Sequence, residues 1–164
     1  MTIPQIPASS PSRQAIALLG WLALCFAAAS TAAFVSTDAW YVTLNKPSWS
    51  PPGWVFGPIW SILYTLMAVA AWLVWRKGGW KVQGKILGVF LLQWFLNAVW
   101  TPLFFGLHQP GLAFAEILLL WLAIAATLML FWRVSKAAGV LLIPYLAWVT
   151  IAAVLNFTIW RLNV

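Results

Sequence analysis

Five long apolar runs constrain this chain more than any other feature, and a single charged residue, Glu116, interrupts them. They cover residues 15–35, 58–75, 86–106, 111–132 and 138–160. A helix needs about 20 apolar residues to cross a hydrocarbon layer of about 30 Å. Only 7% of the residues are charged, whereas soluble domains average about 25%. The runs therefore predict an all-α integral membrane protein, a bundle of five transmembrane helices.

The domain organisation that follows is simple. Residues 1–14 are expected to form an amino-terminal tail and residues 15–164 a single membrane domain, with one long connection over residues 36–57. The first run also resembles a signal peptide because Arg13 precedes it. Its apolar stretch exceeds the roughly 7–15 residues usual for a signal peptide, so we expect a retained helix.

Few residues are available for conventional chemistry. The chain has one cysteine, Cys25, one histidine, His108, and two carboxylates, Asp38 and Glu116. These counts exclude an intramolecular disulfide, a clustered-histidine metal site and most hydrolytic triads. Two carboxylates in the whole chain also make paired-carboxylate catalysis improbable. We expect no metal, no cofactor and no catalytic residue. Haem iron would need an axial ligand in the bundle, and we interpret Cys25, Met67 and Met129 as packing residues.

The basic residues predict the orientation in the membrane. Seven of the nine fall in the amino-terminal tail and in the second and fourth connections: Arg13, Arg76, Lys77, Lys81, Lys85, Arg133 and Lys136. Only Lys46 and Arg161 fall on the other side. The positive-inside rule then places the amino terminus in the cytoplasm and the carboxyl terminus outside, as in a bacterial cell membrane. Since the positive charge lies in short connections, it indicates topology and not nucleic-acid binding.

The long first connection is rich in proline and tryptophan. Such a segment is too rigid and too apolar for a flexible linker. We expect a structured lid over the outer ends of the helices, with these residues at its centre: Trp49, Pro51, Pro52 and Trp54.

Helical spacing predicts which faces look into the bundle. Three runs carry stripes at i, i+4 and i+7 that mix aromatic and amide groups. They are Trp60, Tyr64, Met67 and Ala71; Gln93, Asn97, Trp100 and Phe104; and Trp148, Ala152, Leu155 and Asn156. Amide side chains are costly in lipid, so these faces should converge. A cavity lined by them under the lid, in the outer half of the membrane, is the predicted ligand site.

Structural interpretations stand beside these functional ones. Buried amides such as Asn97 and Asn156 often join helices, and aromatic stripes often only pack. Glu116 lies roughly 9 Å below the outer boundary at 1.5 Å per residue. An acid at that depth is a functional candidate, and a hydrogen-bonded structural carboxylate is an equal alternative.

Several segments resemble the TspO/MBR family, also called the translocator protein or peripheral-type benzodiazepine receptor family. The segment WYVTLNKPSWSPPGWVFGPIWSILYTLM covers the first connection and the second run, and QWFLNAVWTPLFFG lies in the third. The last run, PYLAWVTIAAVLNFTIWRLN, is similar too. The resemblance spans about residues 38–163. It implies a five-helix bundle, usually homodimeric, with a pocket under the first connection.

The resemblance also implies the ligands. Family members bind porphyrins such as protoporphyrin IX and haem, and some bind cholesterol, isoquinoline carboxamides or benzodiazepines. Carried onto this chain, the pocket wall consists of Trp60, Tyr64, Asn97, Trp100, Phe104, Leu119, Trp148, Ala152, Leu155 and Asn156. Leu119 enters through the resemblance alone. The sterol pattern of animal members needs a tyrosine where this chain reads VLNFTIWR, which argues against sterol recognition of that kind.

Three functions follow as hypotheses. The first is a membrane receptor or sensor that binds tetrapyrroles and affects their transport, level or breakdown. The second is an enzyme that degrades porphyrin with light and oxygen, which would rely on tryptophan photochemistry because conventional catalytic groups are lacking. The third is a sterol or porphyrin transporter, which ranks lowest because the chain lacks the internal repeats and paired charges common in transporters.

Overall fold

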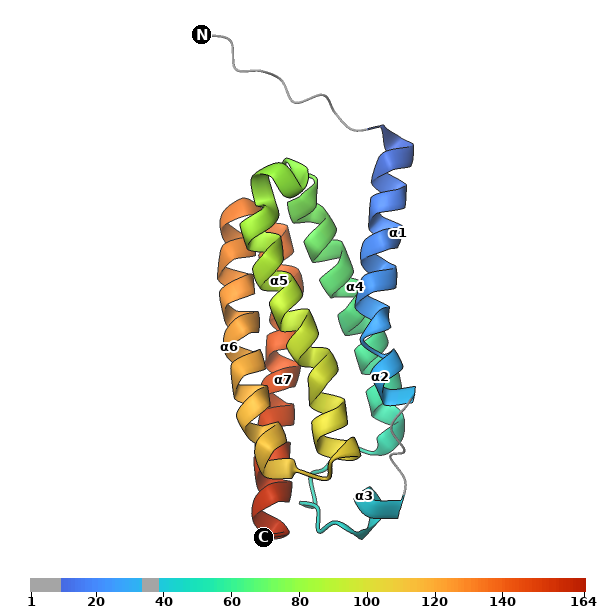
Figure 1. The fold of residues 1–164 in the computed structure, drawn as a ribbon, viewed down its shortest axis with the longest axis vertical. Coiled ribbons are helices and arrows are strands. Elements are labelled where there is room, and N and C mark those ends of the chain that lie inside the picture. Colours follow the sequence, from blue (N-terminus) through green and yellow to red (C-terminus); the bar gives the residue numbers. More distant parts are fainter. Residues whose placement is uncertain (1–9, 34–38) are drawn as a thin grey trace.

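The computed structural model describes residues 10–33 and 39–164, and in these ranges it is a helical bundle (Figure 1). Four helices are long and apolar enough to cross a membrane if the short helical turns at their ends are included. The helices are α1 (Pro11–Ala27), α2 (Ser30–Ala33), α3 (Ala39–Thr43), α4 (Phe56–Trp75), α5 (Gly79–Thr101), α6 (Pro110–Val134) and α7 (Lys136–Leu162). A 3₁₀ turn, η1 (Gly53–Val55), precedes α4, and a π-helical turn, η2 (Pro102–Gly106), follows α5.

The four long helices pack around a common core. Helix α6 lies between α5 and α7, while α4 packs against α7 on one side and α1 on the other. The α4–α5 and α6–α7 connections lie at the end where α1 begins, and α3 and the carboxyl terminus lie at the opposite end (Figure 1). We call the latter the α3 end. Most of the basic residues therefore gather at one end of the bundle, as the topology argument requires, and their cytoplasmic location stays a prediction.

Local sequence explains where the long helices begin. Helix α6 has Pro110 in its first turn, where a missing backbone N–H costs nothing. Helix α7 begins after Ser135, whose side chain accepts a hydrogen bond from the Ala138 backbone N–H at 3.4 Å. Helix α7 therefore extends the predicted span of residues 138–160 by two residues at each end. Pro144 lies inside this helix without ending it, a position that membrane helices tolerate.

The first predicted span is the least accurate. Helix α1 ends at Ala27 and not near residue 35, and it begins at Pro11, inside the predicted tail of residues 1–14. The hydroxyls of Ser30 and Thr31 donate to the carbonyls of Ala27 and Ala28 at 2.6 and 2.8 Å. Such local hydrogen bonds compete with the helical ladder, which explains the turn before α2. The remainder of that span, residues 34 and 35, lies outside the described residues.

Indole N–H groups hold α1 against the bundle. The Trp72 indole of α4 donates to the Gln14 carbonyl at 3.1 Å, and the Trp94 indole of α5 donates to the Leu24 carbonyl at 2.9 Å. Both acceptors belong to the backbone of α1. Some of the 14 tryptophans thus serve as interhelical hydrogen-bond donors, in addition to the interfacial role expected of this residue in membranes.

The predicted lid segment folds back on the α3 end. Asn163 joins it to the carboxyl terminus, accepting from the Asn45 N–H at 2.9 Å and donating to the Asn45 carbonyl at 3.0 Å. The Lys46 ammonium donates to the carbonyls of Tyr41 and Leu44. Trp40 of α3 stacks on His108, with ring centroids 4.3 Å apart. Residues 36–38 of the predicted lid lie outside the described residues.

Close packing of α6 against α7 leads to a first prediction. A Cβ at Gly139 would lie 2.6 Å from the Trp132 ring and 3.0 Å from its Cα, whereas a Cβ at Gly88 would meet nothing within 4 Å. Gly139→Ala should lower the unfolding midpoint in detergent by several degrees, because overpacking costs roughly 1–3 kcal/mol. Gly88→Ala should raise it slightly through helix propensity. Equal shifts for both variants would contradict this packing.

Candidate functional site: an aromatic cavity

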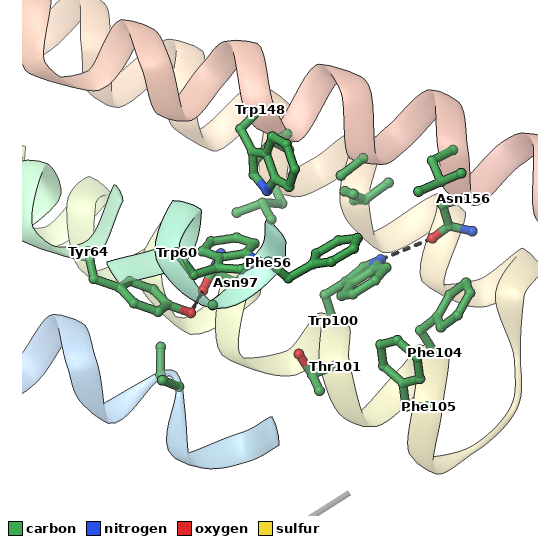
Figure 2. A pocket seen from close by; sticks show the side chains of 18 of the residues that line it. Phe56, Trp60, Tyr64, Asn97, Trp100, Thr101, Phe104, Phe105, Trp148 and Asn156 are labelled. Atoms are coloured by element: carbon green, nitrogen blue, oxygen red, sulfur yellow. Dashed lines mark hydrogen bonds between the residues drawn. The ribbon is translucent and has the colours of Figure 1, made fainter. Parts of the chain in front are cut away.

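A cavity of about 630 Å³ opens between the helices toward the α3 end. This volume falls in the range of about 300–1,000 Å³ that is usual for small-molecule sites. Residues line it from the end of α1 and the α1–α2 turn, from α3, η1 and η2, and from all four long helices. Figure 2 shows its aromatic wall, in which rings from α4, α5 and α7 face a common space.

The aromatic wall is built from ring pairs. Trp60 stacks on Tyr64 within α4, with centroids 5.2 Å apart and an interplanar angle of 29°. On α5 and η2, Trp100 stacks on Phe104 at 5.1 Å and 22°. Trp148 of α7 meets the Phe56 ring of α4 edge to face at 5.8 Å. These contacts restrain the rings, so the cavity presents flat apolar faces.

Two amide groups tie the helices together around the cavity. The Tyr64 hydroxyl of α4 donates to Asn97 Oδ1 of α5 at 3.1 Å. At the α3 end, the Trp100 indole N–H donates to Asn156 Oδ1 at 3.0 Å, and Asn156 Nδ2 donates to the Pro110 carbonyl at 2.8 Å. Both ends of the Asn156 amide thus hold protein groups from other helices. Asn156 therefore joins helices, which is the structural role that the sequence also allowed. It lines the cavity as well.

The structure brings together nine of the ten residues expected in the pocket wall. All nine line the cavity: Trp60, Tyr64, Asn97, Trp100, Phe104, Trp148, Ala152, Leu155 and Asn156. The tenth, Leu119, is not among the lining residues, and 58% of its side chain is exposed on the outer face of α6. Ile117 and Leu120 of the same helix line the cavity instead. Because successive helical residues are 100° apart, a shift of one position turns a side chain away.

The four residues expected at the centre of the lid also lie outside the lining: Trp49, Pro51, Pro52 and Trp54. Trp49 is 49% and Trp54 76% exposed, positions that suit interfacial anchors. The same segment does reach the cavity, through Tyr41, Gly53 and Phe56. The connection therefore contributes to the wall, although its two most exposed indoles do not line the cavity.

Sequence reasoning missed several lining residues. Phe26 comes from the last turn of α1, and Ala28 and Ala29 come from the α1–α2 turn, which the expected continuous helix did not contain. Val149 and Ile159 flank the predicted α7 stripe and widen it. A helix buried on one side usually has an apolar face wider than a single row of residues, and a prediction with that wider face would have included Val149 and Ile159. Phe56, Thr101 and Phe105 lie at or beyond helix ends, where periodicity ceases to apply.

The remaining candidates are placed outside the lining. Cys25 and Met67 are fully buried in the core, as expected of packing residues, whereas Met129 is 59% exposed on the bundle surface. Met129 therefore does not fill the core, because it occupies the outer face of α6. Glu116 is 7% exposed, and neither carboxylate oxygen has a hydrogen-bond partner among the described residues. It does not line the cavity.

Comparison with known proteins identifies the family. Residues 17–161 match the TspO/MBR family. Protein CrtK of Rhodobacter capsulatus is 43% identical over 143 residues, covering 85% of this chain and 88% of that protein. The tryptophan-rich sensory protein of Cereibacter sphaeroides is 44% identical over 145 residues, 88% of this chain and 90% of that protein. The human translocator protein is 44% identical over 126 residues, 76% of this chain and 75% of that protein. The chain is thus a multi-pass membrane protein and belongs to the TspO/MBR family, whose members are bundles of five transmembrane helices.

Proposed function

We propose that this protein is a membrane receptor with a sensory role. It binds tetrapyrroles such as protoporphyrin IX and haem in the aromatic cavity, and thereby affects their transport, level or breakdown. The family assignment supports a ligand-responsive role, since one relative is named a sensory protein and another a translocator protein. The cavity supports the ligand class.

One observation carries the proposal: indoles from three separate helices line the same cavity. Trp60 comes from α4, Trp100 from α5 and Trp148 from α7 (Figure 2). A large flat ring can stack on such faces, and aromatic stacking contributes about 0.5–1.5 kcal/mol for each ring pair beyond burial. Because the three indoles line one cavity from three different helices, a planar ligand can contact more than one of them.

The charge of the cavity restricts how such a ligand lies. Among the described residues that line it, none is an acid, a lysine or an arginine. Carboxylates without a partner are costly to bury. A porphyrin should therefore place its propionate groups at the rim, where Gly53, Gly57 and Ser61 are exposed. Its macrocycle should lie between the indoles.

The test is a titration with protoporphyrin IX, followed by quenching of tryptophan fluorescence. Trp148→Ala should weaken binding about tenfold, because stacking on an aromatic ring contributes roughly 1–3 kcal/mol. Trp54→Ala is the matched control, since Trp54 is 76% exposed and does not line the cavity. This control should bind as the native chain does.

Equal weakening in the two variants would place the porphyrin elsewhere on the protein. Unchanged titrations in Trp148→Ala would remove this residue from the site.

The alternatives stay predictions from the sequence. Degradation of porphyrin would use the same three indoles as photochemical partners. Transport gains no support from Glu116, which lies outside the cavity lining. Binding of isoquinoline carboxamide or benzodiazepine ligands and the homodimer are likewise proposals that rest on the family resemblance.

A further inference from the structure

Positive charge gathers at the end of the bundle opposite the α3 end (Figure 1). We call this the basic end and define it by residues 10–14, 76–85 and 133–136, which contain seven of the nine lysines and arginines. All seven side chains are exposed. Glu116 is the only acid in the described ranges, and it is buried in the half of α6 nearer the α3 end. No carboxylate of the described chain therefore neutralises the basic end.

Four of these cations come from three neighbouring helix ends. They are Lys81 and Lys85 of α5, Arg133 of α6 and Lys136 of α7. Helix α6 packs against both α5 and α7, and the rings of Phe90 on α5 and Phe131 on α6 stack 5.7 Å apart close to this end. Packed helices lie about 8–10 Å apart, which is about one Debye length at physiological salt. An anion near one of these cations is therefore attracted by its neighbours as well.

The other cations come from α1 and from the α4–α5 connection. The Arg76 guanidinium lies over the Trp72 ring, 4.5 Å from its centroid. Because the Trp72 indole donates to the Gln14 carbonyl, Arg76 is held beside the first turn of α1, which also carries Arg13. Lys77 follows Arg76 in the connection. The positive charge is thus spread over the ends of α1 and of all four long helices.

Two exposed indoles lie at the same level as the cations. Trp80 directly precedes Lys81 and is 51% exposed, and Trp132 directly precedes Arg133 and is 41% exposed. The Trp80 ring stacks on Trp21 of α1 with centroids 5.8 Å apart, so it is held at the edge of the bundle. Exposed indoles of membrane proteins prefer the level of the lipid headgroups. The cations beside them therefore meet the phosphate layer of the bilayer.

We propose that the basic end is a docking surface for anionic phospholipids, whose phosphate groups lie among the cations of residues 76–85 and 133–136. Clusters of lysine and arginine next to membrane-spanning helices attract anionic lipids. A zwitterionic lipid carries no net charge, so the surface selects lipids by headgroup charge. Lipid is also the anion that apolar helices hold at the level of the indoles. This surface lies at the other end of the bundle from the aromatic cavity, so the inference does not rest on the proposed function.

The exposed indoles at the two ends serve as reporters in the test. The chain is labelled with 5-fluorotryptophan in an uncharged detergent, and the fluorine NMR signals are assigned with single tryptophan-to-phenylalanine variants. Phosphatidylglycerol or phosphatidylcholine with the same acyl chains is then added. Trp80 and Trp132 report on the basic end. Trp49 and Trp54 are the matched control, because they are 49% and 76% exposed in the segment that folds back on the α3 end.

Phosphatidylglycerol should shift the signals of Trp80 and Trp132 at about one fifth of the mole fraction that phosphatidylcholine requires, the effect of about one basic residue at an anionic surface. The signals of Trp49 and Trp54 should respond equally to the two lipids. Salt at about 1 M should abolish the preference, because the Debye length falls to about 3 Å. Equal responses of all four signals to both lipids would overturn the proposal.

A matched pair of substitutions locates the surface. Arg133→Gln and Arg161→Gln each remove an exposed arginine from the last turn of a helix, the first at the basic end and the second at the α3 end. Both lose the same interaction with the helix dipole. Arg133→Gln should roughly halve the preference at Trp132, whereas Arg161→Gln should leave it at the native value. Equal losses in the two variants would contradict a surface at the basic end.

Adding Lys81→Gln and Lys85→Gln to Arg133→Gln should remove the preference. All three side chains are exposed, so the triple variant should fold, and its unfolding midpoint without added lipid checks this. A preference that survives in the folded triple variant would overturn the proposal.

Two further additions separate lipid from other anions. Inorganic phosphate at the same concentration should leave the signals of Trp80 and Trp132 unshifted, because nothing holds it at their level. Shifts equal to those with phosphatidylglycerol would assign the surface to free phosphate and overturn the lipid assignment. A polyglutamate peptide that displaces phosphatidylglycerol at equal charge would overturn it too, in favour of an acidic protein partner.

Discussion

Replacing Ala152 with phenylalanine is expected to weaken protoporphyrin IX binding by roughly 10- to 100-fold, because overpacking of a filled site costs about 1–3 kcal/mol. Ala152 lines the cavity from α7, one turn after Trp148. A phenyl ring there would project into the space in which the ligand is proposed to lie. The measurement is the fluorescence titration described for Trp148.

The native cavity has room for this ring, so the fold should tolerate it. The cavity holds about 630 Å³, far more than the volume of the phenyl ring that distinguishes phenylalanine from alanine. The unfolding midpoint of Ala152→Phe should therefore stay within a few degrees of the native value. A loss of binding without a loss of stability would assign the effect to the cavity.

Val154→Phe is the matched control for this experiment. Val154 belongs to the same helix, and 53% of its side chain is exposed on the outer face. The same ring placed there would meet lipid and leave the cavity unchanged. Native affinity in Ala152→Phe, or equal weakening in both variants, would contradict the proposed binding site.

Asn156→Leu is expected to lower the unfolding midpoint more than any other single change to the cavity wall. It removes the acceptor of the Trp100 indole N–H and the donor to the Pro110 carbonyl, which lie on α5 and α6. Both protein groups would be left without these partners. We expect a loss of about 2 kcal/mol, or roughly 4–8 °C in the midpoint.

The same change should loosen the cavity. Without the bond to Asn156, the Trp100 ring keeps its contacts with the rings of Phe104 and Phe105 but loses the hydrogen bond that fixes its indole N–H. Porphyrin affinity should fall together with the midpoint. Circular dichroism on heating, followed by fluorescence titration at a temperature below both midpoints, measures the two effects separately.

Asn163→Leu provides the comparison for Asn156→Leu. Asn163 also holds two groups of another segment, the N–H and carbonyl of Asn45, but it is exposed. Water can replace its hydrogen bonds, so its loss should lower the midpoint by less than about 1 kcal/mol. Similar losses for the two variants would show that the buried position of Asn156 carries no special cost.

Most of the cavity wall follows from the sequence because helical periodicity fixes which residues share a face. Trp60 and Tyr64 fall together on α4, and Asn97, Trp100 and Phe104 on α5 and its continuation η2, wherever the neighbouring helices lie. Amides and aromatic groups on one face of a membrane helix turn inward because lipid cannot satisfy them. That argument needs no knowledge of the tertiary contacts.

The errors arise where local contacts decide. The end of α1 depends on hydroxyl hydrogen bonds of Ser30 and Thr31 to the backbone, which apolar length does not reveal. Trp49 and Trp54 are rigid and apolar, as a lid would require, yet an indole can serve equally as an interfacial anchor. Leu119 and Leu120 are the same residue type on consecutive positions, so composition cannot tell which faces inward.

The sequence by itself determined the membrane location, the long helices and their inward faces, because burial in hydrocarbon leaves few other solutions for long apolar runs. The tertiary structure alone decided how those faces meet. It set the hydrogen bond between Tyr64 and Asn97 and the two hydrogen bonds that Asn156 makes to other helices. Each depends on the distance between atoms of different helices, and periodicity within one helix cannot supply that distance.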